Sequence, residues 1–320
     1  MKKSLIVLAA LASVASVASA QSSVTLYGRV DLSVAKNLGS SAKAMQNGSG
    51  SRFGVRGVED LGGGMSAFFN VEHRFNADTG APTDASRMWG GRSLVGLQGG
   101  FGKVSLGREY TTAFLGSQLA NDPWGWDTVA AQATAGITGV GIAKVRNDSS
   151  VTYNFAASGF SFGAQIAEAT DTINNFQKKP FNFSLGYAAG PVSLNFGYEK
   201  TGDVAAASAK VMTLGGAFNM GMVKLGASFG KGNTAANDDH KSWMVTAVAP
   251  MGQGELRAAA GRRNAETAAG ATIAARELSM LAVGYHYALS KRTTVYADFV
   301  RNSKLATQKT AYDFGLKHNF

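Results

Sequence analysis

The feature that most constrains the fold of this chain is an alternation of apolar and polar residues. In the segment 24–34, Leu26 and Val30 fall on one parity while Tyr27 and Arg29 fall on the other. A repeat of two is that of a β-strand, whose successive side chains point to opposite faces. The alternation therefore predicts strands with one apolar face and one polar face.

The same alternation recurs along the chain, in segments joined by tight polar turns or by longer polar loops. We count 16 such segments, at residues 24–34, 51–59, 66–74, 91–98, 102–109, 149–155, 160–166, 181–188, 191–199, 211–219, 222–230, 241–249, 254–262, 278–287, 292–300 and 311–320. An even number of strands with short turns at one end and long loops at the other is typical of an outer-membrane barrel. We therefore predict an all-β fold, a transmembrane antiparallel 16-stranded β-barrel over residues 21–320.

A soluble β-sandwich also alternates, so the alternation alone does not decide between the two. A sheet in lipid must close on itself, because water cannot satisfy its edge groups there. Segments of about ten residues suit a tilted membrane strand. Aromatic residues lie near strand ends on the apolar parity, as membrane interfaces favour. They are Tyr153, Phe155, Phe160, Tyr187, Tyr198, Tyr287 and Phe320.

The first 20 residues carry the pattern of an export signal. Lys2 and Lys3 precede a short apolar run, and "ASA" at 18–20 is a cleavage motif. We expect residues 1–20 to be removed and the mature chain to be exported. The net charge of +10 is spread along the chain rather than clustered, so an exported protein of this kind is not expected to bind nucleic acid.

One connection, about residues 111–146, shows no alternation. It contains "NDPWGWD" at 121–127, in which Pro123 and Gly125 indicate a turn. Long irregular segments in compact proteins are usually functional. Such a loop can cover the surface, or it can fold into the barrel and set the bore.

At this point the sequence resembles the general porins of Gram-negative bacteria, most closely their beta-proteobacterial branch. The resemblance rests on "QSSVTLYGRVD", "SGSRFGVRGVEDLGGGMSAFFNVE", "GRSLVGLQGGFGKVSLGREYT", "VRNDSSVTY" and the terminal aromatic, in this order. It implies a homotrimer in the outer membrane, amid lipid and lipopolysaccharide, with the third extracellular loop folded into the lumen. It also implies that Phe320 is read by the outer-membrane assembly machinery.

The resemblance further implies a ladder of basic residues on one wall of the pore. Motif and parity together give Arg29, Arg52, Arg56, Arg92, Arg108 and Arg146. Parity points Arg108 toward lipid, together with Val104 and Leu106, and we expect a bulge at Gly107 to turn it inward.

The loop offers Asp122 and Asp127 as the acidic partners of this wall, and the turn Pro123, Trp124, Gly125 lies between them. Trp124 stands where the enteric porins carry a glutamate. Fewer carboxylates than guanidinium groups predict an eyelet that prefers small anionic solutes during passive diffusion; the alternative is a weakly selective bore.

Three other functions are weighed. A substrate-specific channel would use Trp124 and Trp126 to stack a solute, but we expect these rings to pin the loop to the wall instead. An enzyme is not expected, because neither HExxH nor GxSxG occurs. An adhesin would lack an inward loop and an arginine wall. Neither a cofactor nor a metal is expected.

Overall fold

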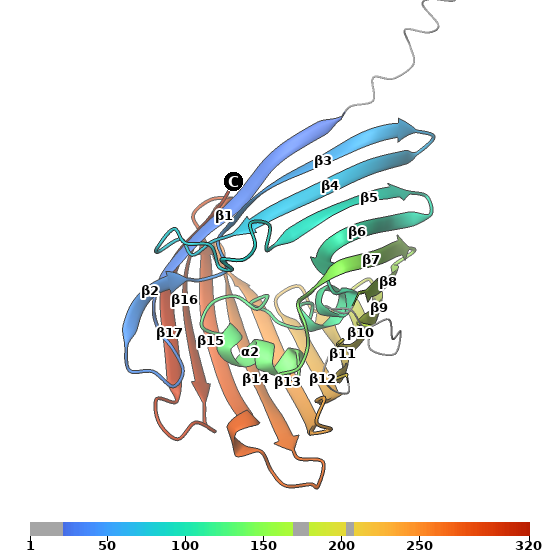
Figure 1. The fold of residues 1–320 in the computed structure, drawn as a ribbon. Coiled ribbons are helices and arrows are strands. Elements are labelled where there is room, and N and C mark those ends of the chain that lie inside the picture. Colours follow the sequence, from blue (N-terminus) through green and yellow to red (C-terminus); the bar gives the residue numbers. More distant parts are fainter. Residues whose placement is uncertain (1–21, 169–178, 203–207) are drawn as a thin grey trace, which may run out of the picture.

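The computed structural model describes residues 22–168, 179–202 and 208–320. The predicted signal peptide, residues 1–20, lies outside the described residues. Strands dominate the part of the chain that the structure describes, and they wrap around a central space that holds a helix (Figure 1). Within those same residues, no helix is both long enough and apolar enough to cross a membrane.

Seventeen strands form one antiparallel sheet. They are β1 Ser23–Lys36, β2 Lys43–Asn47, β3 Arg52–Gly62, β4 Met65–Arg74, β5 Arg92–Gly99, β6 Gly102–Tyr110, β7 Arg146–Ala157, β8 Phe160–Ala167, β9 Phe181–Ala189, β10 Val192–Lys200, β11 Lys210–Asn219, β12 Lys224–Asn233, β13 Asp239–Met251, β14 Gly254–Glu266, β15 Leu278–Ala288, β16 Thr293–Asn302 and β17 Thr310–Asn319. A 3-10 turn, η3 Ala274–Arg276, precedes β15. Each strand from β3 onward pairs with its successor in the chain.

The sheet closes because β1 pairs with β17, from Arg29 opposite Asn319 to Lys36 opposite Tyr312. On its other side, β1 pairs with β2 over Leu32–Lys36 and with β3 over Ser23–Arg29. Strands β2 and β3 therefore occupy one position in the wall, interrupted by the turn at 48–51. Counted this way the barrel has 16 strands, and the predicted fold class is confirmed. The segment β2 was not predicted.

The two faces of the wall differ as the alternation predicts. In β1, Val30 and Val34 are exposed on the outside, while Asp31 and Ser33 are almost fully buried on the inside. Large apolar side chains exposed on the outer face would be costly in water, but they suit a lipid environment. The outer surface is therefore the membrane-facing one.

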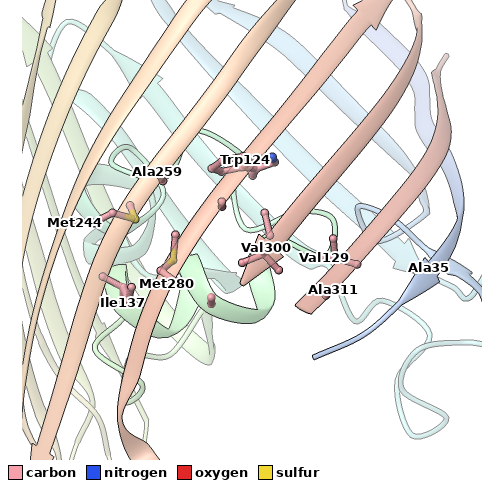
Figure 2. Packing of buried hydrophobic residues seen from close by; sticks show 12 residues of the cluster. Ala35, Trp124, Val129, Ile137, Met244, Ala259, Met280, Val300 and Ala311 are labelled. Carbon is pink, nitrogen blue, oxygen red and sulfur yellow. The ribbon is translucent and has the colours of Figure 1, made fainter. Parts of the chain in front are cut away.

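The connection between β6 and β7, residues 111–145, folds into the barrel as predicted. It carries a π-helix, η1 Phe114–Gln118, and an α-helix, α2 Ala131–Thr138. Figure 2 shows the loop side chains Trp124, Val129 and Ile137 packed toward Met244, Met280 and Val300 of the wall. Fully burying such a side chain contributes about 1.5–3 kcal/mol, so this interface is the apolar core of the molecule.

Polar wall side chains hold the same loop by its backbone. Three loop N–H groups donate to them, Thr112 to Asn182 (2.8 Å), Val129 to Asp313 (3.1 Å) and Lys144 to Glu199 (3.1 Å). Wall groups donate in return, Ser242 to the carbonyl of Ile137 and Arg263 to that of Gly136. These bonds fix the depth at which the loop narrows the lumen.

Candidate functional site

The ring of Tyr110, at the end of β6, is the centre of an arginine cluster. The guanidinium carbon of Arg146 lies 4.0 Å from the ring centroid and that of Arg92 lies 4.8 Å from it. Arg74 donates to the Tyr110 hydroxyl at 2.6 Å, and Arg146 donates to the same oxygen. The quadrupole of the ring attracts Arg92 and Arg146 over its face, and the hydroxyl binds Arg74, so one tyrosine gathers guanidinium groups from β4, β5 and β7.

Two carboxylates lie within this cluster. Glu72 accepts from Arg74 at 2.7 Å, and Glu109 accepts from Arg92 at 2.8 Å. The ring of Tyr110 stacks on Phe114 of η1, with the centroids 5.5 Å apart. The arginine cluster is thereby attached to the start of the inward loop.

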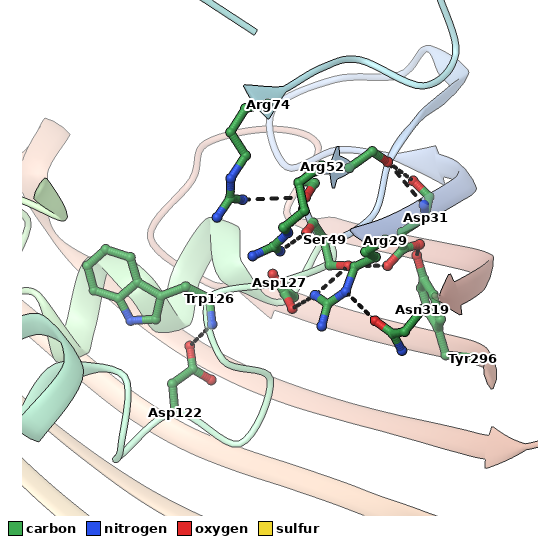
Figure 3. A network of polar contacts seen from close by, with 12 residues as sticks. Arg29, Asp31, Ser49, Arg52, Arg74, Asp122, Trp126, Asp127, Tyr296 and Asn319 are labelled. Atoms are coloured by element: carbon green, nitrogen blue, oxygen red, sulfur yellow. Dashed lines mark hydrogen bonds and ion pairs between the residues drawn. The ribbon is translucent and has the colours of Figure 1, made fainter. Parts of the chain in front are cut away.

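A second group of contacts joins β1 to that loop (Figure 3). Arg29 donates to Asp127 at 3.2 Å, to Ser49 at 3.0 Å and to Asn319 at 3.0 Å. Arg52 donates to the carbonyl of Ser49 at 2.8 Å and, among the described residues, has no carboxylate partner. The turn between β2 and β3 thus holds both guanidinium groups beside the loop.

The charges in these two groups of contacts do not cancel. Six basic groups, those of Arg29, Arg52, Arg74, Arg92, Arg146 and Lys317, lie with four carboxylates, those of Asp31, Glu72, Glu109 and Asp127. Guanidinium groups stay charged at any physiological pH. The wall therefore carries a net positive charge at neutral pH.

The two loop aspartates differ in what they can do. Asp122 is buried and accepts from the backbone of Trp124 and Trp126 and from the hydroxyl of Thr134. Burial raises the pKa of Asp122, and its bonds serve the turn rather than the pore. Asp127 keeps a quarter of its side chain exposed. Desolvation raises the pKa of Asp127 to about 6, although Arg29 and Arg52 act against this shift.

The turn residues between them pin the loop. Trp124 is 2% exposed, and its indole N–H donates to Asp298 at 2.7 Å. Gly125 has φ +67°, a conformation that glycine adopts without strain, and its N–H donates to the carbonyl of Asp122. Pro123 begins this turn. Trp126 packs edge-on against Phe114 and donates to Thr138, so both tryptophans help to hold the loop.

Two of the predicted arginines belong to neither of these two groups of contacts. Arg56 is exposed in the lumen beyond Arg52, with its guanidinium 5.1 Å from the centroid of Tyr27. Arg108 remains on the outer parity, where it pairs with Ser93, and it donates to Asp148 at 2.6 Å. The expected bulge is present, with Gly107 at φ +125°, but it does not turn Arg108 inward. The shift lies in β7, where Asp148 and Ser149 stand opposite Arg108, while Glu109 keeps the inner parity of Ser105 and bonds the inner Arg92.

Sequence reasoning missed part of the site. Arg74 is not among the arginines predicted for the wall, and neither is Tyr110 among the predicted residues, although it stands in the quoted "GREYT" motif. Lys317 was also missed; its charge acts on Asp127. Among the described residues, no group of His, Cys, Asp and Glu side chains could hold a metal ion.

The C-terminal residue closes the barrel next to this site. Phe320 and Gly28 exchange two backbone hydrogen bonds, of 3.0 and 3.1 Å. A Cβ on Gly28 would lie 2.3 Å from the Phe320 ring and 2.7 Å from the Arg52 carbonyl. The glycine of the "LYG" motif is therefore required for close approach rather than for an unusual φ.

Comparisons with known proteins agree with this architecture. Residues 7–305 match the family model described as Gram-negative porin. Outer membrane porin protein 32 of Delftia acidovorans is 31% identical, over 96% of this chain and 92% of the relative. An outer membrane porin protein of Bordetella pertussis is 28% identical over the full length of both chains.

Among solved structures, the anion-selective porin from Comamonas acidovorans superposes with a TM-score of 0.73 at 26% identity, covering 93% of this chain and all of that one. OmpT of Vibrio cholerae in its trimer form gives a TM-score of 0.73 at 16% identity over 93% and 99% of the two chains, a likeness of fold alone. The closed barrel, the inward loop and the full-length matches lead to one conclusion: this chain belongs to the Gram-negative porin family of the outer membrane.

Proposed function

We propose that the barrel lets small hydrophilic solutes diffuse passively through a water-filled lumen and that it prefers anions. The observation that carries this preference is the excess of guanidinium groups over carboxylates at the constriction. A pore selects by its radius and by the charge near its narrowest part. Fixed positive charge lowers the entry barrier for carboxylates and phosphates and raises it for cations. The anion-selective Comamonas porin supports the same reading.

The ion preference is measured directly as the reversal potential of single channels in a KCl gradient. The expected sign is that of chloride permeating faster than potassium. A potential of the opposite sign would overturn the anion preference while leaving the channel itself in place. A planar bilayer that stays silent after insertion would overturn the channel as well.

The preference is expected to depend on Arg146 more than on Arg56. Arg146→Gln removes one guanidinium from the Tyr110 ring, whereas Arg56→Gln removes one that lies outside the cluster. Equal losses of chloride preference in the two variants would show that the total lumen charge matters and the cluster does not.

The remaining partners follow from the family. We propose a homotrimer embedded in outer-membrane lipid and lipopolysaccharide, with Phe320 as the residue read by the assembly machinery. The exposed ring of Phe320 at the end of β17 supports that role. Deleting Phe320 is expected to lower the yield of trimer in the membrane, as measured by heat-modifiable mobility on gels. An unchanged yield would remove the role of Phe320.

Neither rival activity gains support. A sugar-type channel needs free aromatic faces, but Trp124 and Trp126 are both engaged in holding the loop. For an enzyme, the inward histidines would be the natural bases. His240 contacts the carbonyl of Val140, and His286 contacts Asp298 at 3.1 Å, so both help to fix the structure.

A further inference from the structure

Four basic side chains on the outer face of β12, β13, β14 and β16 form no ion pair with an acidic side chain among the described residues. They are Lys231, Lys241, Arg262 and Arg301, and all four are exposed. Their outward direction follows from their neighbours along the strands. His240 and Ser242 contact the inward loop, so Lys241 between them points away from it.

The four cations lie in one row. Lys231 is directly opposite Lys241, and Arg262 is opposite Trp243, two residues nearer the short turns. Arg262 is opposite Ser279, and Arg301 is opposite Leu281, again two residues nearer those turns. Barrel strands are tilted, so a row at constant depth must shift register in this way from strand to strand. The row spans four strand spacings and is about 20 Å wide.

The row borders the lipid-facing belt. Phe229 and Trp243 form an outward pair one step below Lys231 and Lys241, and both rings are about half exposed. Leu281, opposite Arg301, is also exposed. Aromatic side chains at this position mark the depth of lipid headgroups. The cations therefore meet the headgroups at the long-loop end and not the acyl chains.

On the opposite side of the barrel, outward basic side chains form ion pairs. There Arg87 and Arg108 both bind Asp148, at 2.6 Å each. In the row, Arg262 donates to the amide oxygen of Asn264 at 2.7 Å and interacts electrostatically with Glu277 without forming an ion pair. Asp239 and Glu266 face each other one step further toward the long loops and form no ion pair. Four cations against these two carboxylates leave the row with a net positive charge at headgroup depth, since Glu277 is itself paired with Lys304.

We propose that this row is a binding site for phosphorylated lipid headgroups of the outer leaflet. Each lysine or arginine near a membrane surface strengthens binding to anionic lipid about fivefold. A headgroup with two phosphates bridges cations on neighbouring strands, while its acyl chains lie on Phe229, Trp243 and Leu281. The inference depends on the barrel lying in the outer membrane but not on its ion preference.

The test uses the purified full chain in detergent, with diphosphorylated lipid A as the probe and its dephosphorylated form as the comparison. The wild type is expected to retain the diphosphorylated lipid through gel filtration and to bind it more tightly than the dephosphorylated lipid. Lys241→Gln and Arg262→Gln are each expected to weaken binding about fivefold. The variant with all four cations changed to Gln is expected to lose more than about a hundredfold.

Arg87→Gln is the matched control, because it removes an outward cation that Asp148 already compensates. It is expected to bind lipid as the wild type does. Channel selectivity is expected to be unchanged in every row variant, which separates this proposal from the one on ion preference. If the fourfold variant is unstable, the two single variants decide.

Two results would overturn the proposal. One is equal binding of lipid by wild type and row variants. The other is complete displacement of the lipid by inorganic pyrophosphate at equal concentration, which would make the row a site for free anions.

Discussion

The guanidinium of Arg29, on the first wall strand, lies 3.2 Å from the carboxylate of Asp127, on the inward loop. These residues are 98 positions apart in the chain. The pair fixes one rim of the constriction and places its most exposed carboxylate beside the arginine cluster. Because desolvation raises the pKa of Asp127 to about 6, the charge of this pair changes between mildly acidic and neutral pH.

Anion preference is expected to rise as the pH falls from 7.5 to 5. Desolvation raises the pKa of Asp127 to about 6, so its negative charge is lost across this range while the arginines stay charged. The reversal potential in a fixed KCl gradient, measured at several pH values, reports the change. Asp127→Asn is expected to show the acidic-pH selectivity at every pH. A pH step that persists in Asp127→Asn would assign the titration to another group.

The raised pKa also has a consequence for stability. The folded state holds the proton of Asp127 more tightly than the unfolded chain, whose carboxyl titrates at about 3.9. Ionisation of Asp127 therefore opposes folding, and this contribution grows as the pH rises from about 4 to 6. Asp127→Asn is expected to flatten that part of the stability profile, as measured by thermal unfolding at each pH.

Replacing Tyr110 with Leu is expected to disperse the arginine cluster. The ring holds Arg92 and Arg146 by cation–π contact, and its hydroxyl accepts from Arg74. Without it, the three guanidinium groups are free to separate, and chloride preference should fall with little change in net charge. Tyr110→Phe keeps the ring and is the control. If both variants lose the same preference, the hydroxyl and not the ring organises the cluster.

Trp124→Phe is expected to loosen the inward loop. The change removes the indole N–H that donates to buried Asp298, and leaving that acceptor short of a partner costs about 1–3 kcal/mol. A lower melting temperature and noisier single-channel current are the expected readouts. Trp126→Phe tests the neighbouring ring, whose N–H meets a hydroxyl instead of a carboxylate. A larger effect at Trp126 would contradict the assignment of Trp124 as the main anchor.

Gly28→Ala is expected to impair closure of the barrel. The added methyl would meet the ring of Phe320 and the carbonyl of Arg52 at distances that atoms do not tolerate. Reduced refolding yield in detergent and lower heat resistance should result. Gly100→Ala is the control, because its added methyl would meet no atom within 4 Å. Normal refolding of Gly28→Ala would show that the ring and backbone move aside at little cost.

The sequence was sufficient for the architecture because the alternation is local. The sequence of each segment shows which face of the strand is apolar. In lipid, a series of such strands must close into a barrel to satisfy its backbone hydrogen bonds. The inside and outside of the wall, the inward arginines Arg29 and Arg52, and the long loop all follow from this pattern. The alternation could not reveal β2, a five-residue strand without the pattern, or the shared wall position of β2 and β3.

The site depended on contacts between distant segments. The sequence around Tyr110 does not indicate that it contacts arginines from three strands. The sequence of the loop likewise does not indicate that Asp122 bonds the turn backbone while Asp127 contacts Arg29 of the wall. The bulge at Gly107 was expected to turn Arg108 inward. Arg108 instead stays on the outer parity, because it pairs with Ser93 of β5 and the register shift falls between β6 and β7. The sequence by itself determined a closed barrel with a charged interior, because side-chain parity repeats along every strand. Only the tertiary structure decided which charges meet, because pairing depends on register and loop position, which no single segment encodes.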